Sequence, residues 1–178
     1  METCADPDTD APAPPLHLVV MGVSGCGKSS VGRGLSAALG LGFVEGDELH
    51  PPANIAKMAA GTPLTDADRA GWLDTLGTAL ARHPGGAVLT CSALRRSYRD
   101  RLRSSAAGLR FAWLDLDRSS AAARVAQRPA HFFPAGLVDT QFDALEPPTG
   151  EPGVLRLDAL APPGQLVDTV QHWLAMPR

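Results

Sequence analysis

The chain has 178 residues, the length of about one domain, and its 44% hydrophobic and 20% charged residues are typical of a globular protein. Its 16 Lys and Arg against 19 Asp and Glu give a formal net charge of −3, which argues against a nucleic-acid partner. Three widely spaced cysteines match neither a disulfide framework nor a zinc site, and there is no 18-residue apolar run to predict a membrane span. The amino end is acidic and unlike a signal peptide, so we expect a cytoplasmic protein.

Strands and helices alternate along the rest of the chain. Residues 1–15 are rich in Pro, Asp and Ala, and we expect a disordered leader before a single domain over 16–178. Apolar runs predict five strands, at 16–21, 41–47, 86–93, 109–117 and 154–158. Helical spacing predicts helices at 31–39, 50–60, 65–83, 94–104, 118–127, 137–145 and 165–175. This order predicts an α/β fold with a parallel sheet, whose ligands bind at the carboxyl ends of the strands.

A phosphate-binding motif follows the first strand. Residues 22–29 match G-x-x-x-x-G-K-[S/T] at every fixed position, between a predicted strand and a predicted helix. Lys28 is expected to bind the β- and γ-phosphates, and Ser29 to offer its hydroxyl to Mg²⁺. Cys26 is either a small tolerated side chain or a thiol acidified by the loop amides. The expected nucleotide-binding residues are Gly22, Ser24, Gly25, Cys26, Gly27, Lys28, Ser29 and Ser30.

The motif indicates a nucleoside triphosphate but leaves the reaction open. The chain has no Asn-Lys-x-Asp motif of a GTPase, and its second lysine is Lys57. A motor or an AAA-type ATPase would need a longer chain and an Asp-Glu pair ending a later strand. A small-molecule kinase therefore fits this length best. Lys57 either forms a structural ion pair or serves the site.

Polar residues follow the second strand, across the predicted cleft from the loop. Asp47 is the best candidate to orient the acceptor hydroxyl or to accept its proton, although a helix-capping role is the alternative. His50 either donates to a polyol hydroxyl or lies at the surface. Arg69 either binds an anionic acceptor or forms a salt bridge on the helix surface. Asp66 and Asp68 are expected to cap the next helix rather than to bind metal.

A second polar cluster follows the third strand. The Ser92 hydroxyl and the Arg95 guanidinium can bind a carboxylate or hydroxyl groups. The arginines that continue this helix are expected to form a solvated face, and they are Arg96, Arg99, Arg101 and Arg103.

A third cluster lies near residues 124–145. Arg124 and Arg128 stand four residues apart and lead into an irregular loop that carries His131. Such a pair suits a lid that neutralises the transferring phosphoryl group, and surface arginines are the alternative.

Taken together, these segments resemble the bacterial and eukaryotic gluconokinases, P-loop small-molecule kinases related to shikimate and adenylate kinases. The resemblance covers about residues 18–147 and rests on MGVSGCGKSS, EGDELHPPANIAKMAAGTPLTDADRAGWL, CSALRRSYRDRLR and RPAHFFPAGLVDTQFDALEPP. The second and third segments are more specific than the loop because shikimate and nucleotide kinases lack them. Two positions depart from the family pattern: Thr140 replaces a serine, and Gly71 replaces a larger residue.

The resemblance implies a function and a site. It implies ATP- and Mg²⁺-dependent phosphorylation of D-gluconate to 6-phospho-D-gluconate, feeding the pentose phosphate pathway. It also implies a three-layer α/β/α fold with strand order 2-3-1-4-5, a mobile lid over about 124–145, and a homodimer. The expected catalytic residues are Lys28, Asp47, Arg124 and Arg128. The expected gluconate-binding residues are Asp47, His50, Arg69, Ser92, Arg95, His131 and Gln141.

Two other functions compete with this interpretation. The first is a P-loop kinase for another small acceptor, such as shikimate, a different sugar acid or a nucleoside. The second is a non-catalytic ATP-binding module. The intact Lys28, Ser29 and Asp47 argue against the second.

Overall fold

A single parallel sheet forms the centre of the molecule. The computed structural model describes residues 14–127 and 136–177. The sheet has the order β2-β3-β1-β4-β5, which confirms the expected topology. Its strands are β1 (Leu16–Met21), β2 (Gly42–Glu45), β3 (Gly86–Thr90), β4 (Arg110–Asp115) and β5 (Val154–Asp158).

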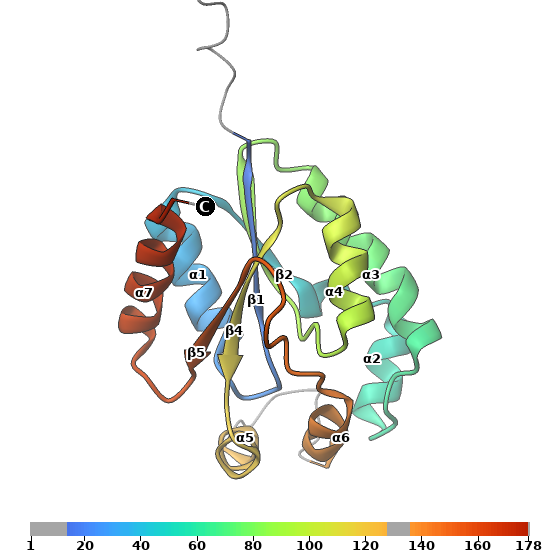
Figure 1. Cartoon of the computed structure of the whole chain (residues 1–178). Helices are drawn as coiled ribbons and strands as arrows, with labels where there is room; N and C mark the ends of the chain where they lie inside the picture. The colour runs from blue at the N-terminus through green and yellow to red at the C-terminus, as the bar shows by residue number, and fades with distance from the viewer. Residues whose placement is uncertain (1–13, 128–135, 178) are drawn as a thin grey trace, which may run out of the picture.

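Helices cover both faces of this sheet, as Figure 1 shows: α1 and α7 lie on one side, and α3 and α4 lie on the other. The helices are α1 (Lys28–Leu39), α2 (Pro52–Ala59), α3 (Asp66–Ala81), α4 (Arg96–Ser105), α5 (Arg118–Ala126), α6 (Leu137–Ala144) and α7 (Pro163–Ala175), with a short 3-10 helix η1 (Gly46–Leu49). The expected three-layer α/β/α architecture is therefore confirmed. Among the described residues, no helix is long and apolar enough to cross a membrane.

The core divides into two layers because side chains of a strand alternate between the faces of the sheet. In β1, Leu18 and Val20 pack into the cluster beneath α1 and α7, whereas Val19 and Met21 pack beneath α3 and α4. All four side chains are fully buried. The continuous apolar sequence of β1 is explained by this burial on both faces.

The strands β2 and β3 end earlier than the sequence predicts. β2 ends at Glu45 and the chain turns into η1, so Asp47 lies on a short helix rather than at the end of a strand. Gly46 permits this turn by close approach, because a Cβ there would lie 2.0 Å from the carbonyl oxygen of Thr90. β3 ends at Thr90, and a loop leads from there to α4. In this loop, Ala93 has a left-handed φ of 45°.

Candidate active site

The loop between β1 and α1 presents backbone donors to open space. Gly22, Gly25 and Gly27 have φ angles of 145°, 86° and 98°. Gly27 is the N-cap of α1 and has no side chain to occupy the free N–H groups of the first helical turn. A Cβ at Gly27 would meet no atom within 4 Å. The loop and the positive end of α1 therefore fit a phosphate group.

Lys28 is partly exposed, whereas Cys26 in the same loop is buried. Lys28 Nζ donates to the carbonyl oxygens of Gly22 and Val23, each at 3.1 Å, and so lies over the loop. Cys26 is 1% exposed, and burial raises the pKa of its thiol despite the nearby positive charge of Lys28. The structure thus supports a packed Cys26 side chain and contradicts the acidified thiol.

A cavity adjoins the loop at the carboxyl ends of the strands. Its walls come from distant segments of the chain, and they are lined by Ser24, Lys28, Asp47, His50, Met58, Leu64, Arg69, Trp72, Ser92 and Gln141. Five of the expected acceptor-binding residues lie in these walls: Asp47, His50, Arg69, Ser92 and Gln141. Arg95 does not line the cavity, and His131 lies outside the described residues. A larger cavity of about 590 Å³ lies at the amino ends of β4 and β5 and has none of these residues in its lining.

We call the cavity that adjoins the loop the acceptor cavity. Asp47 lies where it meets a second hollow in front of the phosphate-binding loop. Ser24, Lys28 and Asp47 line both spaces. The position of η1 depends on β3, because Gly46 N donates to Thr90 Oγ1 at 3.1 Å. The carboxylate of Asp47 is therefore held on the boundary between the two spaces.

His50 forms a wall of the cavity together with Trp72. Their rings stack with centroids 3.9 Å apart, and Trp72 Nε1 donates to the Gly46 carbonyl at 2.8 Å. Burial lowers the pKa of His50 to about 4, so its ring is neutral at pH 7. Asn54 Nδ2 lies 3.4 Å from His50 Nδ1 and is a donor, which favours the tautomer with the proton on Nε2. That nitrogen can donate to a hydroxyl group.

Arg69 lines the same cavity from α3. One of its terminal nitrogens donates to the Leu64 carbonyl, and its guanidinium carbon lies 5.7 Å from the ring centre of Tyr98. These contacts hold the positive charge at the edge of the cavity. The salt bridge considered from sequence is replaced by this carbonyl and aromatic contact.

The capping role expected of Asp68 is confirmed. Asp68 and Thr65 form a reciprocal capping box at the start of α3. Asp68 also accepts from Lys57 Nζ at 2.7 and 2.9 Å, which joins α2 to α3. The hydrogen bond from Lys57 is the largest contribution that lowers the pKa of Asp68 to about 2. Lys57 therefore forms a structural ion pair and is not among the residues that line the cavity.

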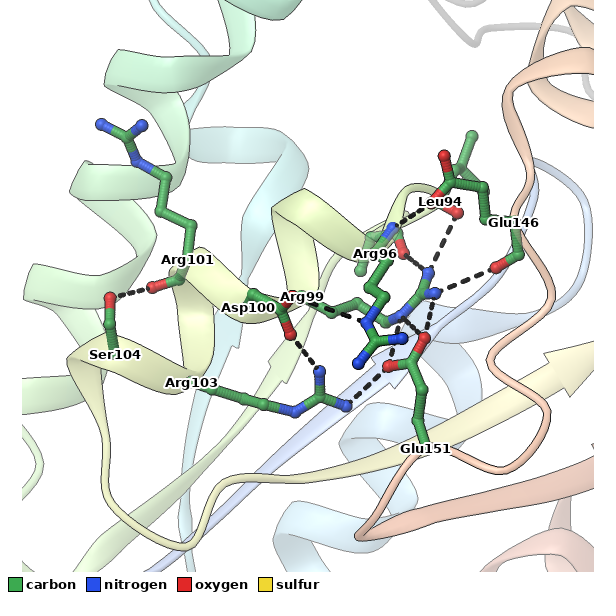
Figure 2. Close-up of polar contacts among 10 residues, drawn as sticks. Leu94, Arg96, Arg99, Asp100, Arg101, Arg103, Ser104, Glu146 and Glu151 are labelled. Carbon is green, nitrogen blue, oxygen red and sulfur yellow. Dashed lines mark hydrogen bonds and ion pairs between the residues drawn. The ribbon is translucent and has the colours of Figure 1, made fainter.

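Ser92 and Arg95 are close in sequence but lie differently. Ser92 lines the cavity, and its carbonyl oxygen accepts from Gly22 N at 3.3 Å. Arg95 instead pairs with exposed Asp66 at 2.9 Å and is absent from the cavity lining. The expected solvated face of the helix is wrong for Arg99, which is 0% exposed because its guanidinium meets Glu151 and three backbone carbonyls, as drawn in Figure 2.

Arg124 lies on the other side of the loop. Its terminal nitrogens donate to the carbonyls of Gly25 at 3.3 Å and Ala159 at 3.2 Å. It lines a separate cavity of about 420 Å³ with Gln127 and Pro163. Arg124 thus joins the loop to the segment before α7. Arg128, expected to act with it, lies outside the described residues.

The last acceptor-binding candidates lie on or near α6. Gln141 Oε1 accepts from Ser24 N at 2.6 Å, which ties α6 to the loop. Thr140 keeps the hydroxyl of the expected serine and donates to the Leu137 carbonyl at 2.7 Å. Residues 128–135 of the expected lid, His131 among them, lie outside the described residues.

Sequence reasoning missed three residues that line the cavity, Met58, Leu64 and Trp72, and one that contacts a lining residue, Asn54. Trp72 was noted as part of a family segment but not as a site residue, and Asn54 was not singled out. Helical spacing could have found Trp72, because it is three residues from Arg69 on the same helix.

Comparisons with known proteins agree with this geometry. A family model described as an AAA domain matches residues 18–148, although chain length had argued against an AAA-type ATPase. This match identifies the P-loop domain, whereas similarity to individual proteins identifies a narrower family. A gluconokinase from Gluconobacter oxydans is 45% identical over 165 residues, which cover 90% of this chain and 93% of that protein. The thermosensitive gluconokinase of Escherichia coli is 42% identical, covering 79% and 78%.

A solved structure agrees as well. The crystal structure of a gluconokinase from Sinorhizobium meliloti is similar with a TM-score of 0.79 and 44% identity. The alignment covers 91% of this chain and 98% of that chain. The residues that the family model matches, 18–148, include the loop and every residue that lines the acceptor cavity.

Proposed function

This chain belongs to the gluconokinase family, and we propose that it transfers the γ-phosphoryl group of ATP to the 6-hydroxyl of D-gluconate, giving 6-phospho-D-gluconate and ADP. One observation supports this most: Asp47 and Lys28 line both the hollow in front of the loop and the acceptor cavity. Phosphoryl transfer is mainly positioning and charge stabilisation, so it requires two adjoining sites of this kind.

The residues around the loop fit a nucleoside triphosphate. The first-turn N–H groups of α1 and the ammonium of Lys28 would hold the phosphates, and Arg124 would contribute charge from the opposite side. Ser29 would offer its hydroxyl to Mg²⁺, which neutralises phosphate charge when bound. In the described ranges, no group of three His, Cys, Asp or Glu side chains could hold a metal ion.

The acceptor cavity offers the groups that gluconate requires. Gluconate has several hydroxyls and one carboxylate, so its site needs hydrogen-bonding partners and a cation. His50, Ser92 and Gln141 supply the former, and Arg69 supplies the charge. We assign the carboxylate to Arg69 rather than to Arg95, because Arg95 is paired with Asp66 outside the cavity.

Asp47 orients the 6-hydroxyl and accepts its proton. The hydroxyl oxygen then bonds to the γ-phosphorus while the bond from that phosphorus to the β,γ-bridging oxygen breaks. Lys28 stabilises the charge on the transferring group. Arg128 remains a predicted contributor to the same charge.

A coupled ADP-release assay tests the function. The acceptors are D-gluconate, shikimate, a second sugar acid and a nucleoside, each compared with ATP alone. We expect turnover with gluconate well above the ATP-only rate. A rate with gluconate no higher than that background would refute the proposal, and turnover with another acceptor would identify a different kinase.

Two further proposals come from the sequence: the homodimer rests on the family resemblance, and the cytoplasmic location rests on the composition. We expect a homodimer in the cytoplasm. Light scattering coupled to size-exclusion chromatography should report twice the mass of the chain, and a monomer mass would contradict this expectation.

A further inference from the structure

Arg99 is a charged residue in the interior of the molecule. It lies on α4 and is 0% exposed. Its Nε donates to the carboxylate of Glu151 at 3.0 and 3.2 Å, and one terminal nitrogen donates to the same group. Arg103 binds that carboxylate as well, at 2.8 Å. Burial of an ion pair is unfavourable unless its remaining donors are satisfied, so the other partners of Arg99 are informative.

The remaining donors of Arg99 bind backbone carbonyls from two segments. Nη1 donates to Ala93 at 2.8 Å and Leu94 at 3.0 Å, and Nη2 donates to Glu146 at 3.0 Å. Figure 2 shows the guanidinium between Leu94, Glu146 and Glu151. The Leu94 carbonyl also accepts from Glu146 N at 2.9 Å. One planar fork of donors thus joins the loop after β3 to the segment after α6.

These two segments continue into the walls of the acceptor cavity. Ser92, which lines it, directly precedes Ala93. Ala93 has a left-handed φ of 45°, a conformation that a residue with a side chain keeps only when its surroundings hold it. Gln141 lies five residues before Glu146 and binds the loop backbone at Ser24.

We propose that Arg99 is a positioning residue for the acceptor: it fixes Ser92 and Gln141 relative to the phosphate-binding loop. The inference rests on the proposed function, because it assumes that this cavity binds the acceptor. The loop itself takes its shape from its glycines and from α1. Loosening the Arg99 contacts therefore affects gluconate more than ATP.

The test compares Arg99→Lys with Arg101→Lys as a matched control. Both substitutions keep the charge and lie on α4, but Arg101 forms an exposed pair with Asp74 and points away from the cluster in Figure 2. A lysine has one ammonium and cannot reproduce the fork of Arg99. We expect R99K to raise the KM for gluconate at least fivefold and to leave the KM for ATP within twofold. R101K should leave both within twofold.

A second substitution tests the role of the turn. Glycine adopts φ 45° without strain. Adding A93G to R99K should therefore lower the raised KM for gluconate part of the way back to the wild-type value. An unchanged gluconate KM in folded R99K, or an equal rise in both KM values, would overturn the proposal. If R99K does not fold, Glu151→Gln takes its place. We expect E151Q to raise the KM for gluconate threefold, and an unchanged gluconate KM or an equal rise in both KM values would overturn the proposal.

Failure of the proposed function is distinguishable from failure of this inference. If the proposed function is wrong, the wild-type protein shows no turnover with gluconate. Hydrogen exchange then tests the positioning role of Arg99 without any activity measurement. The amides of Gly22 and Glu146 bond to Ser92 and Leu94, so they should exchange faster in R99K than in R101K. Equal protection in both variants would overturn the positioning role.

Discussion

The phosphate-binding loop and the acceptor cavity adjoin, yet they are built in different ways. The loop consists of consecutive residues, 22–29, and its shape comes from glycines and the start of α1. The cavity collects side chains from η1, α3, α6 and the loop after β3. Its walls depend on tertiary contacts such as Gly46 with Thr90 and His50 with Trp72. A contiguous site is therefore encoded locally, whereas a dispersed site depends on the packing of the whole domain.

The largest expected effect comes from removing the charge of the loop. Lys28→Met should lower gluconate-dependent turnover by about 10²–10³-fold, because one electrostatic group of the phosphoryl site is lost. ADP release measures this effect, and circular dichroism checks the fold. Ala37→Ser, at an exposed position of the same helix, is the control and should stay near wild type. Turnover of K28M near that of the wild type would show that the loop does not act as proposed.

A somewhat smaller effect is expected at the boundary between the two sites. Asp47→Asn should lower turnover by about 10²-fold, as for loss of a general base. The KM for ATP should change little, because the loop is intact. Glu48→Gln, at the exposed neighbouring position, should have no effect. Near-normal turnover of D47N with an unchanged pH profile would exclude Asp47 as the base.

The acceptor wall should also respond to pH through His50. Burial lowers its pKa to about 4 from an ordinary value of 6.5. As the pH falls, the unfolded chain therefore binds a proton on His50 at a higher pH than the folded protein does. The contribution of neutral His50 is complete above pH 6.5 and is lost as the pH falls toward 4. Integrated over this window, the loss is at most about 3 kcal/mol.

Urea unfolding of the wild type and His50→Gln between pH 7 and pH 4 measures this contribution. The difference between the two proteins cancels other titrating groups, including His17, whose pKa burial also lowers. Asp68 acts in a lower window, because its contribution is lost only between about pH 3.8 and 2. A wild-type advantage that stays constant from pH 7 to pH 4 would contradict the buried neutral His50.

The smallest effect is expected on α3, away from the cavity. Gly71 is exposed and a Cβ there meets no atom within 4 Å, so Gly71→Ala should stabilise the protein by about 0.5–1 kcal/mol. Kinetic constants should not change. The same substitution at Gly46 should destabilise the protein, because its Cβ would collide with the Thr90 carbonyl. A thermal-melting comparison of the two variants tests whether the acceptor wall depends on this close approach.

Several features of the fold could be predicted because they are local. The apolar sequence of β1, the capping residue Thr65 and the stop at Gly40 predicted their elements closely. The end of β2 could not be predicted, because the turn at Gly46 depends on a contact with β3 more than forty residues away. For the same reason the sequence did not show that Lys57 would pair with Asp68.

By itself, the sequence determined the fold class, the phosphate-binding loop and the family, because each depends on consecutive residues or on order along the chain. Only the tertiary structure decided the roles of two arginines that are four residues apart in the sequence. Arg95 pairs with Asp66 at the surface, and Arg99 is buried between Glu151 and three carbonyls. Helical order places the side chain of Arg99 inward, but the partners that make its burial favourable come from segments distant in sequence.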